Sequence, residues 1–151
     1  MKINILYGSS CVGKSTLMRN MPKENFIKIE MDDCEYWRNP ENQWEDISIE
    51  YLKKSIINNI NNNPIKKTEM VITCGGLPLP THEIYNELSE KYNIKFFHIL
   101  IICKNMDIYK KQIIKRGRVN IIEKLINDHK WRENNKDIYD KILINLKLKL
   151  I

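Results

Sequence analysis

Short apolar runs along this chain alternate with segments in which apolar residues recur every three or four positions. The runs are rich in β-branched and aromatic residues and predict five β-strands, at 2–7, 26–31, 70–74, 95–103 and 141–146. The runs at 70–74 and 95–103 are the most continuously apolar, as expected for strands buried on both faces of a sheet. Strands that alternate with helices predict an α/β fold with a parallel, doubly wound sheet.

The segments between these runs predict helices. Good helix formers from Thr16 to Asn20 predict a helix that ends near Met21. The spacing of isoleucine and leucine predicts four more helices: one of about three turns over 47–60, one capped by Thr81, one that begins near Met106, and one from Ile121 through Arg132. His98 lies inside the fourth apolar run, so we expect it to be a core residue rather than a catalyst.

The junction of the first strand and first helix carries the strongest functional pattern. Residues 8–15, Gly-Ser-Ser-Cys-Val-Gly-Lys-Ser, match the phosphate-binding pattern G-x-x-x-x-G-K-[ST]. The glycines let backbone N–H groups wrap around phosphates, Lys14 places a charge on the β- and γ-phosphate oxygens, and Ser15 can ligate Mg²⁺. With the partial charge of the helix start, the predicted nucleotide-binding residues are Gly8, Ser10, Cys11, Val12, Gly13, Lys14, Ser15 and Thr16.

A pair of carboxylates follows the second predicted strand. Asp32 and Asp33 are expected at the carboxyl edge of the sheet, where ligands bind in α/β proteins. We predict that Asp32 is the general base that takes the proton of an attacking hydroxyl, with Asp33 beside it at the substrate. A turn or a helix cap formed by either residue is the alternative.

Two further segments are candidates for substrate contacts. Residues 34–43, followed by Trp44, are polar and aromatic and include Arg38; they form either a flap that stacks a base or rings that pack onto the domain. Gly75 and Gly76 follow the third strand, where they let backbone approach a ligand or only turn the chain. No aspartate closes this strand, so a metal ligand common there in P-loop enzymes is missing.

The fourth predicted helix ends in Lys115-Arg116-Gly117-Arg118, called here the basic tip. Phosphoryl transfer spreads negative charge over the equatorial oxygens, and an arginine on a mobile segment stabilises it. We therefore predict a small helical lid at about 106–120, in which Arg116 contacts the nucleotide and Arg118 the substrate. Ordinary capping of a helix by basic residues and a glycine is the alternative.

Composition narrows the class of protein. A chain of 151 residues predicts one domain over 1–151, and 25 Lys and Arg against 19 Asp and Glu give a net charge of +6, which suits a polyanionic partner. Lysine, isoleucine and asparagine are abundant throughout, so part of this charge is compositional. The four cysteines lack metal-type spacing and are expected to be reduced thiols. No apolar stretch long enough for a membrane span or signal peptide is present, which predicts a cytoplasmic protein without membrane contact.

With these motifs in place, the chain resembles a small P-loop kinase of the polynucleotide-kinase type over nearly its whole length. The resemblance implies that Asp32 activates the acceptor hydroxyl and that Arg116, before a glycine in the lid helix, touches the transferred phosphate. Two positions depart from that family. Glu35 stands where the family has an arginine, and Cys74-Gly75-Gly76 replaces an aspartate, in a sequence similar to the glycine-rich substrate loop of shikimate-type kinases.

The resemblance, which extends to phage kinases that phosphorylate hydroxymethyluracil in DNA, implies an ATP- and Mg²⁺-dependent phosphotransferase. The expected acceptor is a hydroxyl on nucleic acid, either a 5′ end or a 5-hydroxymethyluracil base in DNA. Two alternatives stay open. One is a kinase for a free nucleotide or a small hydroxyl metabolite, favoured by Gly75 and Gly76. The other is a non-catalytic protein that binds nucleotide, favoured by the missing carboxylate after the third strand.

Overall fold

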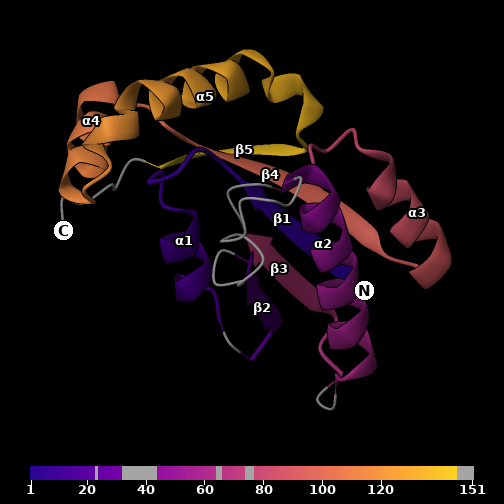
Figure 1. The fold of residues 1–151 in the computed structure, drawn as a ribbon. Helices are drawn as coiled ribbons and strands as arrows, with labels where there is room; N and C mark the ends of the chain where they lie inside the picture. The colour runs from indigo at the N-terminus through magenta and orange to yellow at the C-terminus, as the bar shows by residue number, and fades with distance from the viewer. Residues whose placement is uncertain (23, 32–43, 64–65, 74–76, 146–151) are drawn as a thin grey trace.

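A computed structural model describes residues 1–22, 24–31, 44–63, 66–73 and 77–145, with side chains of 44–48 excepted (Figure 1). Five parallel strands form one sheet in the order β2-β3-β1-β4-β5. Their bounds are β1 Lys2–Tyr7, β2 Phe26–Glu30, β3 Glu69–Thr73, β4 Lys95–Cys103 and β5 Lys141–Asn145. The predicted parallel α/β sheet is therefore confirmed, with each strand close to its predicted range.

The helices between the strands are α1 Lys14–Asn20, α2 Trp44–Asn61, α3 Glu83–Tyr92, α4 Met106–Lys115 and α5 Ile122–Asn134. Single 3-10 turns, η3 Val119–Ile121 and η4 Lys136–Ile138, come before and after α5. Helix α2 has 18 residues and is longer than the predicted three turns. Apolar spacing marks only the buried face of a helix, whereas its backbone hydrogen bonds continue beyond that face.

The cap predicted for α3 is wrong by one residue. The N-cap is His82, whose Nδ1 accepts a hydrogen bond of 3.1 Å from the Ile84 N–H. The His82 N–H itself donates to Leu79 O at 2.9 Å, so Thr81 lies inside the turn before the helix. An N-cap must directly precede the first helical residue, and here that residue is Glu83.

Different helices cover the two faces of the sheet (Figure 1). On one face, Ile3, Ile5 and Tyr7 of β1 pack in a buried cluster with α2 and α3. On the other face, Leu6 packs in a second buried cluster with residues of α1, α4 and α5. Because β1 lies between β3 and β4, it is buried on both faces, and the loop that follows it emerges at the middle of the carboxyl edge.

In the described part of the chain, no helix is long and apolar enough to cross a membrane. Cys11 and Cys103 are buried free thiols, as predicted, while Cys34 and Cys74 lie outside the described residues. His98 is 9% exposed within β4, which confirms its prediction as a core residue.

Candidate functional site

Residues 8–13 connect β1 to α1 and are called here the 8–13 loop. Its backbone turns sharply because Cys11 has φ 70° and Gly13 has φ 103°, both in the left-handed region. Gly13 adopts this conformation without a Cβ penalty, whereas Cys11 does so as a non-glycine residue. Alternation of left- and right-handed residues turns successive N–H groups toward one side, the backbone geometry that binds anions.

Gly13 is the N-cap of α1. The first hydrogen bond inside the helix runs from the Leu17 N–H to Gly13 O, at 3.0 Å. By helix geometry, the N–H groups of Gly13, Lys14, Ser15 and Thr16 have no acceptor within α1. These four groups lie at the carboxyl edge of the sheet beside the turn at Cys11, whereas the Val12 N–H donates within the loop to Ser9 O at 3.3 Å.

Gly8 sits in a space that admits no side chain. A Cβ built on it would lie 2.6 Å from Val12 Cγ1 and 2.9 Å from Ile101 O. The loop therefore packs directly on the backbone of β4, and only glycine allows this approach. The first glycine of the sequence pattern has a steric role, while the second, Gly13, has a conformational one.

The side chain of Lys14 is folded into the loop. The residue is only 7% exposed, and its ammonium donates to Gly8 O and, at 3.3 Å, to Ser9 O. A buried positive charge among backbone dipoles, next to helix N–H groups, favours an anion. Ser15 is half-buried and Thr16 exposed in the same helical turn.

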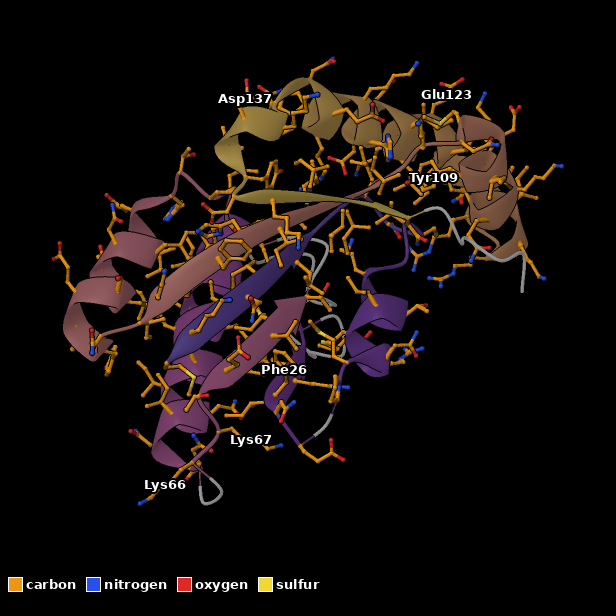
Figure 2. All side chains as sticks on the ribbon, turned by 180° about the vertical axis from the view of Figure 1, so that it is seen from behind. Phe26, Lys66, Lys67, Tyr109, Glu123 and Asp137 are labelled. Atoms are coloured by element: carbon orange, nitrogen blue, oxygen red, sulfur yellow. The ribbon has the colours of Figure 1, made fainter. Side chains whose placement is uncertain are left out.

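Two side chains distant in sequence hold the loop. Tyr109 of α4 points at it from the sheet-facing side of the helix (Figure 2). Its hydroxyl lies 2.6 Å from Ser9 Oγ and donates to Ser10 O at 2.7 Å. Asn145, in β5, donates from Nδ2 to Val12 O at 3.0 Å. Sequence reasoning missed Tyr109 and Asn145, because helical spacing marks Tyr109 as buried but does not say which loop it meets.

The basic tip has the geometry of a Schellman C-cap. Gly117 has φ 71°, its N–H donates to Ile114 O at 3.0 Å, and the Arg118 N–H donates to Ile113 O at 3.1 Å. The backbone of the basic tip therefore caps α4, as the alternative predicted. The side chains of Arg116 and Arg118 take no part in this cap and are exposed. Residues 106–118 carry five Lys or Arg and one Asp, a net charge of +4, and all five basic residues are exposed.

The end of β3 contributes a hydroxyl rather than a carboxylate. Thr73 pairs with Leu6 of β1 and is fully buried. Its Oγ1 has no hydrogen-bond partner among the described residues. Buried hydroxyls without partners are rare, so this atom is a candidate contact for a bound group or water at the carboxyl edge.

The structure brings together the predicted residues of the 8–13 loop and the first turn of α1: Gly8, Ser10, Cys11, Val12, Gly13, Lys14, Ser15 and Thr16. Arg116 and Arg118 lie at the far end of α4, the helix that contacts the loop through Tyr109. Asp32, Asp33, Arg38, Gly75 and Gly76 lie outside the described residues. Within the described residues, no group of three or more His, Cys, Asp or Glu could hold a metal ion.

Comparison with known proteins finds similarity at the level of structure. No protein-family model and no curated protein sequence matches the chain. A crystal structure of shikimate kinase from Bacteroides thetaiotaomicron is similar with a TM-score of 0.57 and 13% identity, over 97% of this chain and 88% of that one. An uncharacterized protein from Eubacterium ventriosum is similar with a TM-score of 0.51 and 17% identity, over 96% of this chain and 88% of that one. Together with the strand order and the 8–13 loop, these likenesses identify the P-loop kinase fold.

Proposed function

We propose that this protein is a kinase that transfers the γ-phosphate of ATP to a hydroxyl group in the presence of Mg²⁺. The 8–13 loop carries the proposal. It combines a glycine packed on β4, two left-handed residues and a buried lysine at the start of α1. This combination suits a triphosphate, and the P-loop kinase fold supports the same class of ligand.

Each site residue has a distinct task in this proposal. The loop N–H groups and Lys14 bind the phosphates, and Ser15 ligates the metal. Bound ATP and Mg²⁺ supply the phosphoryl group and neutralise its charge. The donors of the loop fit such an anion, and Thr73 Oγ1 is a buried hydroxyl at the same edge without a partner among the described residues.

Outside the 8–13 loop, Asp32 orients the acceptor hydroxyl and accepts its proton. Arg116, on a lid formed by about 106–120, stabilises the charge that develops during transfer. Asp33, Arg38, Gly75, Gly76 and Arg118 complete the acceptor side.

The acceptor we propose is a hydroxyl on nucleic acid, at a 5′ end or on a 5-hydroxymethyluracil base in DNA. The distribution of charge supports this choice. Four of the six net positive charges of the chain lie within 106–118, on exposed side chains of α4 and the basic tip. A concentrated, exposed positive charge suits the phosphate backbone of a nucleic acid. We expect the protein to work in the cytoplasm.

A free nucleotide or small hydroxyl metabolite is the second candidate acceptor, favoured by the glycine pair after β3. A third possibility is a non-catalytic protein that binds nucleotide. It is favoured by the missing carboxylate after β3, where P-loop enzymes commonly place a metal ligand.

A transfer assay with ATP labelled at the γ-phosphate tests these possibilities. Purified protein is offered 5′-hydroxyl oligonucleotides, DNA containing 5-hydroxymethyluracil, nucleosides and small alcohols, with the Lys14→Ala variant as control. We expect label in nucleic acid with the wild type and none with the variant. Label only in small molecules contradicts the nucleic-acid acceptor, while tight ATP binding without any transfer supports the non-catalytic alternative.

A further inference from the structure

The phenol of Tyr109 makes an ordered pair of hydrogen bonds to the 8–13 loop. A tyrosine hydroxyl carries one proton, which Tyr109 gives to Ser10 O at 2.7 Å. The contact of 2.6 Å to Ser9 Oγ is then donated by the serine. Tyr109 is completely buried, so water does not substitute for these bonds. Burial also raises the pKa of Tyr109 to about 12, which keeps the phenol a donor at physiological pH.

The bond to Ser10 O orients a neighbouring amide. Ser10 O and the Cys11 N–H belong to the same peptide unit, and the structure has no cis peptide bond among the described residues. In a planar trans peptide, the C=O and the N–H point in opposite directions. A carbonyl held toward Tyr109 therefore directs the Cys11 N–H away from α4, as one of the donors of the loop.

The same contact lies beside the strained residue of the loop. Cys11 has φ 70°, a conformation that a non-glycine residue keeps only where its surroundings enforce it. The Cys11 side chain is buried in the cluster that contains Tyr109. The Tyr109 hydroxyl thus fixes the peptide on one side of Cys11, while core packing fixes its side chain.

The ring of Tyr109 packs against a residue of α5. It lies 5.1 Å from the ring of His129 in α5. His129 Nε2 accepts a hydrogen bond of 3.0 Å from the Cys103 N–H at the end of β4, and its Nδ1 lies 2.9 Å from Glu133 Oε1. An imidazole whose Nε2 accepts from a backbone amide has its proton on Nδ1. His129 therefore links the ring of Tyr109 to α5 and to the end of β4.

From this geometry we propose that Tyr109 is a positioning residue for the nucleotide, whose hydroxyl holds the Ser10–Cys11 peptide in the phosphate-binding conformation. The inference rests on the proposed function, since it takes the 8–13 loop to be the donor-nucleotide site. It adds a residue from α4, the helix that also carries Arg116 at its C-terminal end. Holding the loop and presenting the lid arginine are thus two tasks of one helix.

The test compares two buried phenols. Tyr109→Phe removes the hydroxyl at the loop, and Tyr85→Phe removes one on the opposite face of the sheet, where it donates to Pro78 O at 2.6 Å. We measure the dissociation constant of a fluorescent ATP analogue with Mg²⁺, and amide hydrogen exchange of residues 8–14 in the ligand-free protein. Tyr109→Phe removes the hydrogen bonds to both Ser9 and Ser10, and loss of the one to Ser10 O, which orients the peptide, corresponds to about a tenfold change in affinity.

We expect Tyr109→Phe to weaken nucleotide binding about tenfold and to accelerate exchange in the loop, and Tyr85→Phe to change both by less than about twofold. Equal affinity and equal exchange in Tyr109→Phe and the wild type overturn the inference. If the wild type binds no nucleotide, the proposed function fails, and the positioning role fails with it. If the wild type binds nucleotide and Tyr85→Phe weakens binding as much as Tyr109→Phe, the effect is one of general stability and the inference is again overturned.

Discussion

The hydroxyl oxygen of Tyr7 lies 2.9 Å from Nδ1 of His98, in the interior between the sheet and α3. Tyr7 is the last residue of β1, and its hydroxyl is also 2.8 Å from that of Tyr85. Burial lowers the pKa of His98, although the nearby Asp140 carboxylate raises it. The same burial raises the pKa of Tyr7. Both groups are therefore neutral in the folded protein at neutral pH.

The stability of the fold should depend on pH through His98. The unfolded chain takes up a proton near the ordinary pKa of 6.5, whereas the folded protein does so only at lower pH. Acid thus favours the unfolded state, and the free energy of unfolding should fall as the pH drops from about 7 through 6.5. Burial lowers the pKa of His129 as well, so both histidines act in the same direction.

Urea unfolding between about pH 5 and 7.5 measures this dependence. His98→Asn keeps a polar group in the core but does not titrate, so its slope of stability against pH should be shallower than that of the wild type. A slope unchanged in both His98→Asn and His129→Asn would contradict the assignment of neutral, buried imidazoles.

Replacing Gly8 by alanine should destabilise the fold by about 1–3 kcal/mol, because the new Cβ overlaps Val12 Cγ1 and Ile101 O. Gly117→Ala is a matched control, since no atom lies within 4 Å of its Cβ and only the φ of 71° is unfavourable. The control should lose about 1 kcal/mol. Denaturant unfolding of both variants measures the difference. A larger loss of unfolding free energy for Gly117→Ala than for Gly8→Ala would contradict the steric role of Gly8.

Lys14→Ala should weaken nucleotide binding and turnover together. The ammonium is expected to contact phosphate in the ground state and in the transition state, so its removal affects both. Titration with nucleotide and the transfer assay give the two quantities. Near-normal turnover would remove the central argument for the 8–13 loop as a phosphate site.

Asp32→Asn should leave nucleotide affinity almost unchanged and lower kcat by about 10²–10⁴-fold, the usual contribution of a general base. Asp33→Asn is the matched variant, because it removes the neighbouring carboxylate. Both are compared in single-turnover transfer and in nucleotide titration. A silent Asp32→Asn beside a damaging Asp33→Asn would transfer the role of base to Asp33.

Arg116→Ala should also act on kcat, with a loss of roughly 10³-fold if the guanidinium stabilises the transferred phosphoryl group. Arg116→Lys should not restore activity, because an ammonium cannot reproduce the planar fork that contacts two phosphate oxygens. Arg116 is the C-cap of α4 through its backbone, so neither variant should perturb the helix itself. Full activity of Arg116→Lys would contradict the role of Arg116 in phosphoryl transfer and leave helix capping as the role of the basic tip.

The sequence was sufficient to predict the sheet and the loop, because both depend on local patterns. Apolar runs marked the five strands, and the spacing of Gly8, Gly13 and Lys14 marked the 8–13 loop. The helix ends were less accurate. His82 rather than Thr81 caps α3, since a cap depends on where the backbone turns and both residue types can accept the hydrogen bond.

The supports of the site could not be predicted in the same way. Tyr109 meets Ser9 across 100 positions of sequence, and Asn145 meets Val12 across 133. Such pairings follow from the order of strands in the sheet, which apolar spacing does not determine. The roles of Asp32, Asp33, Arg38, Gly75, Gly76 and Arg116, the single-domain organisation and the nucleic-acid acceptor stay predictions.

The bond from Asn145 to Val12 O has a consequence for protein synthesis. The 8–13 loop precedes β5 and its Asn145 in the chain, so the loop leaves the ribosome before Asn145 is made. Until then Val12 lacks this partner, and β4 lacks its neighbour on one side. A nascent chain therefore carries the whole phosphate-binding sequence long before it can hold that sequence in its final shape, so nucleotide binding should begin only after β5 has joined the sheet.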